Sequence, residues 1–440
     1  MSELNLWFDP TKCLINGEWV APASGQVLPL TDPSTGAEIG AIARGGAADI
    51  EAAIDAARTA FEGAWGRTPA SVRGRILLKL RDLVLDRVED LARIEAMDVG
   101  KPLKQARADA IALARYCEFY GGAADKLHGE TIPYLDGYTV YTLREPHGVT
   151  GHIVPWNYPM QIIGRSVGAA LATGNACVLK PAEDACLTAL AFADMAKEAG
   201  LPDGVLNVVP GLGAEAGAAL SSSSKVDHIS FTGSVATGIQ VQMAATPNVV
   251  PVTLELGGKS PQIVFDDADI DAALPFLVNA GVQNAGQTCS ASSRILVHRS
   301  VYDQVLARMA ERYGALRVGP AMADLDVGPL ISAKQHGIVS GFLAKGGDLE
   351  TAAQGVLQDA PEGGNFIQPT LFAGVSPDHA LAQDEIFGPV QVVIPFADED
   401  EAVSIANGTE YGLVASVWTQ NGARQMRMAK RIRTGQVFIN

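Results

Sequence analysis

From residue 149 onward, short apolar segments alternate with helical segments, and this alternation constrains the fold more than any other feature of the chain. The predicted strands are Val149–Val154, Ala176–Leu179, Val205–Val208, Val226–Ile229 and Val252–Leu254. The predicted helices between them are Met160–Leu171, Ala185–Glu198, Ala214–Leu220 and Val235–Met243. Strict alternation of this kind indicates βαβ crossovers and a parallel sheet that is covered on both faces.

A second cycle of strands and helices begins near Pro261, which predicts a second α/β lobe. Its first elements are strands Gln262–Phe265 and Arg294–Val297 and helices 269–283 and 301–313. The segment Leu256–Ser260 separates the two cycles, so we expect a cleft to open there.

The region before residue 149 has three parts. The first 42 residues read as short strands and turns, such as Cys13–Ile15 and Glu18–Val20. Apolar residues from Ile76 to Ile94 recur at steps of three and four, which predicts one long helix. The Asp-Gly pair within 131–146 lies between β-favouring residues and predicts a hairpin that reaches outward, as an arm toward another subunit.

Charge and composition exclude several functions for this chain of 440 residues. Its 33 basic and 49 acidic residues give a net charge of −16, which argues against binding nucleic acid or an anionic membrane. No apolar segment is long enough to cross a bilayer, and the first twenty residues lack the apolar core of a signal peptide. Five widely spaced cysteines with no C-x-x-C pair are typical of a cytoplasmic protein.

Most motif matches in the chain are weak. The seven histidines show no metal-ligand spacing, so no metal site is predicted. Gly211–Gly217 departs from a dinucleotide fingerprint and is interpreted as a strand-to-helix turn, and Gly257–Ser260 fails the P-loop pattern at Thr253. Ser166 sits in a G-x-S-x-G pattern, but inside a predicted helix rather than on the elbow that a serine hydrolase needs.

Two sites remain as candidates from local chemistry. The segment from Phe231 to Ser234 follows a strand and opens a helix, where free N–H groups favour an anion such as a phosphate. Cys289 lies in a small, polar loop, Asn284–Ser290, whereas structural cysteines usually lie within apolar periodic segments. A loop thiol near backbone N–H groups can be held as the nucleophilic thiolate, although a structural role stays open on these grounds alone.

Six ordered motifs resemble those of the NAD(P)-dependent aldehyde dehydrogenase superfamily along essentially the whole chain. They are Pro155–Pro159, Lys180–Glu183, Phe231–Ser234, Leu254–Pro261, Gly286–Cys289 and Glu385–Pro389. The resemblance implies an α/β fold with two Rossmann-like parallel-sheet lobes and an oligomerisation hairpin. It places an NAD-binding domain at 1–127 and 147–256, the hairpin at 128–146 and a catalytic domain at 257–440.

The resemblance also implies an enzyme that oxidises an aldehyde to a carboxylic acid. Cys289 would attack the aldehyde to give a thiohemiacetal, and the Asn157 amide would help to hold its oxyanion. After hydride transfer, Glu255 would activate the water that hydrolyses the thioester, which favours hydrolysis over transfer to coenzyme A.

The cofactor residues implied by the resemblance are Pro155, Trp156, Lys180, Glu183, Gly233, Ser234, Gly257, Glu385 and Phe387. A carboxylate at Glu183 can accept from ribose hydroxyls and would repel a 2′-phosphate, so NAD is preferred over NADP.

Substrate residues are implied around the helix after Asn157 and the cysteine loop. They are Tyr158, Ile162, Arg165, Thr288 and Ser290. We hypothesise that Arg165 recruits a carboxylate or polar group on the aldehyde; the alternative is that it pairs with an acid or faces solvent.

One departure from the family pattern concerns the end of the chain. Family members continue beyond the strand that Gly435–Asn440 resembles, so a truncated chain is expected. The family implies a homo-oligomer, a dimer or tetramer, whose assembly the shortened end places in question. The rival to a working enzyme is a catalytically silent scaffold that acts as a binding or structural protein.

Overall fold

The computed structural model describes residues 6–440 and divides into two compact units. Unit 1 comprises the described residues up to Thr31, together with Glu38–Asp98 and Ala106–Glu255. Unit 2 comprises Asp32–Ala37, Val99–Gln105 and Leu256–Asn440. Residues 1–5, which belong to the amino-terminal stretch considered above for a signal peptide, lie outside the described part.

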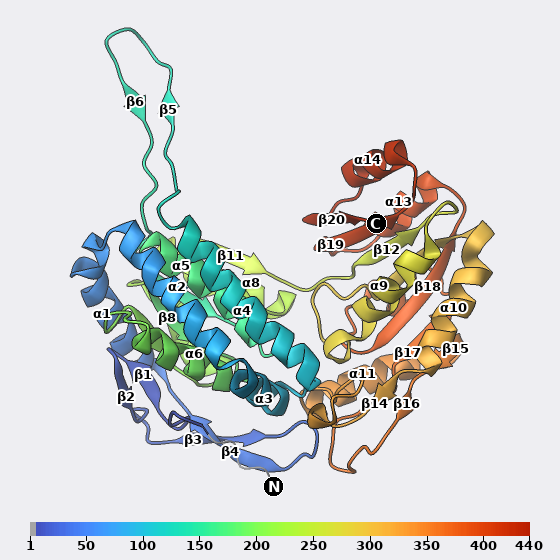
Figure 1. Ribbon diagram of the computed structural model, residues 1–440, viewed down its shortest axis with the longest axis horizontal. Coiled ribbons are helices and arrows are strands. Elements are labelled where there is room, and N and C mark those ends of the chain that lie inside the picture. The colour runs from blue at the N-terminus through green and yellow to red at the C-terminus, as the bar shows by residue number, and fades with distance from the viewer. Residues whose placement is uncertain (1–5) are drawn as a thin grey trace. The chain divides into compact units, whose positions relative to one another are not determined.

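Unit 1 is built on a seven-stranded sheet in the order β11-β10-β7-β8-β9-β1-β2 (Figure 1). Its strands are β1 (Cys13–Ile15), β2 (Glu18–Val20), β7 (Val149–Ile153), β8 (Ala176–Lys180), β9 (Leu206–Val208), β10 (His228–Thr232) and β11 (Val252–Glu255). The five strands from β11 to β9 run parallel, as the alternation of strands and helices predicts. β7 and β8 are buried along their whole length because helices cover both faces of the sheet.

The helices of unit 1 begin with α1 (Ala47–Glu62), α2 (Ala70–Asp86), α3 (Val88–Val99) and α4 (Leu103–Ala123). The crossover helices that follow are α5 (Pro159–Thr173), α6 (Leu187–Glu198), α7 (Ala218–Ser222), which continues a π-helical turn at Gly213–Gly217, and α8 (Val235–Ala245). The junction between α3 and α4 belongs to unit 2, which includes Val99 at the end of α3 and the first turn of α4.

The prediction of one long helix through Ile76–Ile94 is wrong. The chain breaks at Arg87, whose φ of −112° and ψ of 21° end α2 before α3 begins. Leu80 of α2 and Leu91 of α3 are both buried in the same core, so the apolar spacing continues across the break. Periodicity reports which face is buried and does not detect a single non-helical residue.

The strand predicted at Val226–Ile229 is shifted, because β10 spans His228–Thr232. Its neighbour β11 forms the edge of the sheet, and the burial of β10 alternates along its length. A half-exposed strand lacks a continuous apolar segment, so the sequence placed it too early.

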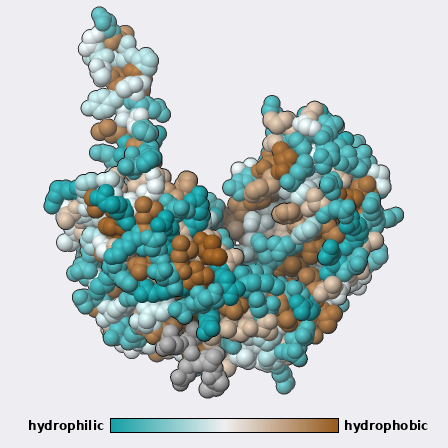
Figure 2. All heavy atoms as spheres, viewed as in Figure 1, coloured by the Kyte–Doolittle hydropathy of each residue, from teal (hydrophilic) through white to brown (hydrophobic). Residues whose placement is uncertain are grey.

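Two small hairpins complete unit 1. One pairs β3 (Val27–Thr31) with β4 (Glu38–Ala43), and the other pairs β5 (Thr131–Ile132) with β6 (Val140–Tyr141). The β5–β6 hairpin stands clear of the other elements of its unit, and hydrophobic residues lie along it (Figures 1 and 2). This is the arm that the Asp-Gly turn predicts.

Unit 2 has its own seven-stranded sheet, in the order β15-β17-β18-β13-β12-β19-β20. Its strands are β12 (Pro261–Val264), β13 (Arg294–His298), β15 (Glu350–Gln354), β17 (Thr370–Ala373), β18 (Val390–Phe396), β19 (Val414–Trp418) and β20 (Gln436–Ile439). All neighbours run parallel except β15, which is antiparallel to β17. A separate pair joins β14 (Arg317–Val318) to β16 (Val356–Leu357).

The helices of unit 2 are α9 (Ile270–Val282), α10 (Tyr302–Gly314), α11 (Ala333–Lys345), α12 (Ala380–Gln383), α13 (Glu399–Asn407) and α14 (Gly422–Arg431). The buried Arg294 at the start of β13 donates to the carbonyls of Ile405 and Ala406 at 2.8 and 2.9 Å. These carbonyls lie in the last turn of α13, where the helix dipole favours a cation. The arginine therefore binds the sheet to a crossover helix without a carboxylate.

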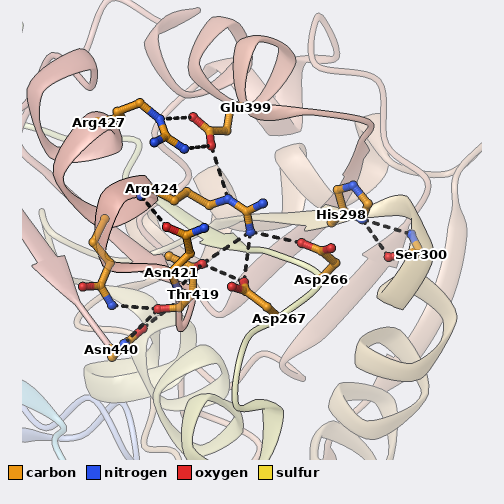
Figure 3. Close-up of polar contacts among 11 residues, drawn as sticks. Asp266, Asp267, His298, Ser300, Glu399, Thr419, Asn421, Arg424, Arg427 and Asn440 are labelled. Atoms are coloured by element: carbon orange, nitrogen blue, oxygen red, sulfur yellow. Dashed lines mark hydrogen bonds and ion pairs between the residues drawn. The ribbon is translucent and has the colours of Figure 1, made fainter.

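A single arginine also joins the carboxy-terminal helix to the rest of unit 2 (Figure 3). Arg424 of α14 contacts Asp266 at 3.1 Å, Asp267 at 3.0 Å and Glu399 at 3.3 Å. Its guanidinium carbon also lies 4.4 Å from the ring centre of Phe265. These contacts hold α14 against the turn after β12 and the start of α13.

Candidate active site

Four of the predicted site segments of unit 1 lie at the carboxyl ends of the parallel strands of its sheet. Asn157 follows β7, Lys180 ends β8, Gly233 and Ser234 follow β10, and Glu255 ends β11. The pairs Ile153↔Lys180 and Thr232↔Glu255 place these strand ends side by side. Ligands of open parallel sheets bind at the carboxyl ends of the strands, so this edge is the expected place for a cofactor.

Lys180 and Glu183 form an ion pair at this edge. The Lys180 side chain is almost fully buried, and its Nζ lies 2.9 Å from Oε2 of Glu183. Burial would raise the pKa of Glu183, but the charge and hydrogen bond of Lys180 outweigh it, so the pKa is lowered. Glu183 therefore stays ionised, with the ammonium beside it as a donor.

The loop from β10 into α8 presents an open helix amino terminus. Ser234 is exposed and caps α8 by accepting from the Thr237 N–H at 3.3 Å. The Gly233 N–H donates to the carbonyl oxygen of Glu255 at 3.0 Å, which fixes the end of β11. The remaining N–H groups of the first turn suit a phosphate.

Asn157 lies in the short connection between β7 and α5. Asn157 is buried. The neighbouring residues Pro155, Trp156, Tyr158 and Gln161 are half-buried. Tyr158 precedes the first residue of α5, and its carbonyl accepts from the Ile162 N–H at 3.0 Å.

The three substrate residues proposed at the start of α5 and within it, Tyr158, Ile162 and Arg165, differ in exposure, and Tyr158 is half-buried. Ile162 packs into the core of unit 1, whereas Arg165 is exposed. Arg165 makes no ion pair with any residue of the described chain, but its charge acts on the phenol of Tyr120 on α4. Ser166 lies within α5 and donates to the Ile162 carbonyl at 2.8 Å, as a mid-helix serine does, so a serine-hydrolase elbow is excluded.

In unit 2, the predicted residues lie in loops that precede strands. Cys289 comes before β13, Gly257 before β12, and Glu385 and Phe387 before β18. β12, β13 and β18 are neighbours in the sheet, so these loops gather at the amino ends of the strands. Thr288 is buried, and Cys289 and Ser290 are half-buried.

The three loops of unit 2 touch through backbone atoms. A β-carbon on Gly258 would collide with the carbonyl oxygen of Cys289, and one on Gly286 would collide with that of Gly388. A β-carbon on Gly257 would meet the carboxylate of Glu385. Only glycine allows these close approaches, which explains the glycines of the motifs.

Glu385 is held by the Gly258 N–H, which donates to its Oε1 at 3.0 Å. Burial raises the pKa of Glu385, and this hydrogen bond and the charge of Lys259 offset part of the effect. Phe387 has a left-handed φ of 55°, and its carbonyl accepts from the Gln335 side chain at 2.9 Å. The loop is therefore fixed on both sides of Ile386.

Sequence reasoning did not identify Lys259. Its side chain is buried, and its Nζ has no hydrogen-bond partner in the structure. Burial and the nearby Arg294 lower the pKa of Lys259 to about 7, although two carboxylates act in the opposite direction. The signal available in the sequence was a lysine that directly follows two glycines and comes just before a strand that is buried.

The remaining four cysteines differ sharply from Cys289. Cys13, Cys117, Cys177 and Cys186 are all fully buried. Burial raises the pKa of the first three to about 12, so these thiols are protonated and inert at neutral pH.

The described residues 6–440 contain neither a group of His, Cys, Asp and Glu side chains suited to a metal ion nor a helix able to span a membrane. The proposed site residues form two clusters, one in each unit. Unit 1 gathers Asn157, Lys180, Glu183, Gly233, Ser234 and Glu255, and unit 2 gathers Gly257, Thr288, Cys289, Ser290, Glu385 and Phe387.

A model of the aldehyde dehydrogenase family matches residues 19–440. The chain belongs to the aldehyde dehydrogenase family. It is 46% identical to aldehyde dehydrogenase family 2 member B4, mitochondrial, of Arabidopsis thaliana, over 98% of this chain and 81% of that protein.

Solved structures of aldehyde dehydrogenases have the same fold. One from Burkholderia cenocepacia assigned to this family is 63% identical, with a TM-score of 0.97 over 97% of this chain and 91% of that one. The NAD⁺ complex of an aldehyde dehydrogenase from Bacillus cereus is 40% identical, with a TM-score of 0.95 over 100% of this chain and 89% of that one. The two-sheet α/β fold predicted from the sequence is confirmed, and these relatives favour an aldehyde dehydrogenase over the catalytically silent scaffold.

The exposure of this dehydrogenase's thiols predicts a selective modification. Iodoacetamide added to the native protein at neutral pH is expected to alkylate Cys289 alone, because the other thiols are fully buried and protonated. Peptide mass mapping measures the labelled position. Cys289→Ser is the control and should take up no reagent until the protein is unfolded; comparable labelling of Cys177 in the native protein would contradict the account.

Proposed function

We propose that this aldehyde dehydrogenase uses NAD to oxidise an aldehyde to its carboxylic acid, with Cys289 as the nucleophile. The observation that carries the proposal is the contrast between Cys289 and the other thiols. Cys289 is half-buried, and its carbonyl lies against Gly258, whose N–H holds the Glu385 carboxylate.

The first step is attack of the Cys289 thiolate on the carbonyl carbon. A C–S bond forms, and the carbonyl π electrons move to oxygen to give a thiohemiacetal oxyanion. The Cys289 N–H would donate to this oxyanion, and the resemblance to the family assigns a second donor, the Asn157 side-chain amide. Fixed donors that face a developing charge contribute about 3–4 kcal/mol each to such steps.

Each unit offers groups that suit part of a dinucleotide. Lys180 and ionised Glu183 suit the hydroxyls of a ribose, and the α8 amino terminus at Ser234 suits a phosphate. Glu385, held by the Gly258 N–H, suits the second ribose. NAD, when bound, would supply the hydride acceptor, and loss of the hydride from the former carbonyl carbon would leave Cys289 holding the acyl group as a thioester.

Hydrolysis completes the reaction. Glu255 takes a proton from a water molecule, whose oxygen attacks the thioester carbon. The C–S bond then breaks, the carboxylic acid leaves, and Cys289 returns to the thiolate. Glu255 is exposed at the end of an edge strand, so water reaches it directly.

Removing this base is expected to stop the cycle after one turnover. Glu255→Gln keeps the size of the side chain but cannot take the proton, so each enzyme molecule should form one equivalent of NADH and then slow by about 10²-fold or more. Stopped-flow absorbance of NADH measures the burst and the steady rate. Glu18→Gln, which changes an exposed glutamate on edge strand β2, is the matched control.

Steady turnover of Glu255→Gln at the wild-type rate would contradict the assignment of the base. A folded wild-type chain that binds NAD and oxidises no aldehyde would instead support the silent scaffold.

We further propose that Arg165 selects aldehydes that carry a carboxylate or another polar acceptor. The exposed guanidinium has no acidic partner in the described chain, so its charge is available to a ligand. Tyr116 and Tyr120 of α4 lie against Gly164 and Gly168 of α5 and form an aromatic surface beside it.

Arg165→Ala is expected to lower kcat/KM for a carboxylated aldehyde about tenfold and to leave that for a neutral aldehyde of equal length unchanged. A charge-assisted hydrogen bond of about 1.5 kcal/mol corresponds to this factor. Arg115→Ala, which removes an exposed arginine of α4 that is paired with Glu118, is the control. An unchanged ratio between the two substrates would refute the role.

We propose that the β5–β6 hairpin holds a homo-oligomer together, as a dimer or tetramer. The arm exposes several large side chains, Ile132, Tyr134, Leu135, Tyr138, Tyr141 and Leu143. Exposed apolar groups at this density mark an interaction surface.

A cytoplasmic location remains a prediction, supported by five free cysteines.

Introducing charge on the arm is expected to reduce the assembly to a smaller species. The Leu135→Asp/Leu143→Asp variant should show a lower mass by light scattering after size-exclusion chromatography, because it places carboxylates in the contact. Leu85→Asp on α2, an exposed leucine outside the arm, should keep the wild-type mass. An unchanged mass for the arm variant would count against the interface.

A further inference from the structure

The loop that leads to Cys289 begins with three consecutive left-handed residues. Asn284 has φ 49° and ψ 38°, Ala285 has φ 53° and ψ 36°, and Gly286 has φ 72°. Left-handed residues normally occur singly, and alanine adopts this region at a cost because its β-carbon crowds the following carbonyl. Such a turn persists only where surrounding contacts determine it.

Two glutamine side chains hold the backbone of Asn284 from both sides. The Asn284 N–H donates to Oε1 of Gln105 at 2.8 Å, and the Asn284 carbonyl accepts from Nε2 of Gln287 at 3.0 Å. Gln287 is itself fixed because its Oε1 accepts from the Ile331 N–H at 2.9 Å. Gln287 belongs to the loop, whereas Gln105 comes from a segment 179 residues away.

Gln105 is well placed to act as an anchor. It lies in the first turn of α4, within the segment Val99–Gln105 that belongs to unit 2. The neighbouring Lys104 N–H donates to the Asp324 carboxylate at 2.7 Å, which ties this turn to unit 2. The Gln105 N–H donates to the Pro102 carbonyl at 2.9 Å, so the residue that offers the acceptor is itself held at its backbone.

We propose that Gln105 is a positioning residue for the reaction, which holds the left-handed turn 284–286 and through it the thiol and N–H of Cys289. This inference rests on the proposed role of Cys289. Without the acceptor, the turn can relax toward right-handed geometry, and the loop that follows it moves. A displacement of about 1 Å at a reacting group can cost about 10²-fold in rate.

Gln105→Ala is expected to lower kcat/KM at least tenfold while the Kd for NAD stays within twofold of wild type. Adding Ala285→Gly to this variant should recover most of the loss, because glycine adopts the left-handed region without the β-carbon clash. Gln425→Ala is the matched control: this glutamine of unit 2 is half-buried like Gln105, and its side chain also bonds a backbone group, donating to the Thr419 carbonyl at 2.7 Å. It should retain wild-type turnover.

A second readout does not depend on aldehyde oxidation. The pH profile of Cys289 alkylation by iodoacetamide should shift to higher pH in Gln105→Ala, because backbone N–H groups no longer stabilise the thiolate as well. The shift should reverse in the double variant. If wild type shows no Cys289-dependent turnover, the proposed function fails, and the alkylation profile alone then decides the positioning role.

Three results would overturn the inference: turnover of Gln105→Ala within twofold of wild type, an alkylation profile that does not move, or a loss that Ala285→Gly fails to recover. The last result would mean that Gln105 acts on overall folding rather than on the turn.

Discussion

Close backbone contact among three loops of unit 2 is the constraint on which the site depends. Gly258 lies against the carbonyl of Cys289, Gly286 against that of Gly388, and Gly257 against the Glu385 side chain. Any side chain at these glycines would force the loops apart. The thiol and the carboxylate proposed to bind ribose are therefore placed by the same contacts, and a shift in one loop is felt by the others.

The candidate residues lie at opposite strand ends in the two sheets. In unit 1, the candidate residues follow the strands, as at Lys180 and Glu255, where helix amino termini and strand ends favour a dinucleotide. In unit 2, the candidate residues precede the strands, as at Cys289 and Glu385. Each of these unit 2 loops leads directly into a buried parallel strand, so Cys289 and Glu385 are positioned by the sheet that follows them.

The sequence predicted most of the fold because buried parallel strands and amphipathic crossover helices leave strong periodic signals. It failed where a single backbone residue decides, as at Arg87 between α2 and α3. It made Cys289 a candidate because a small polar loop around a thiol is unusual, and only the resemblance to the family proposed its role as nucleophile. It could not show the left-handed turn at Asn284, nor its bond to Gln105, because both depend on residues that meet only after folding.

The central claim is that the substrate becomes covalently bound to Cys289 during turnover. Mass spectrometry of the protein, quenched in acid while it oxidises an aldehyde in the presence of NAD, tests this most directly. The account predicts an acyl group on the peptide that contains Cys289, with a mass that follows the aldehyde used. An acyl group on another residue, or turnover with no adduct even when hydrolysis is slowed by Glu255→Gln, would contradict it.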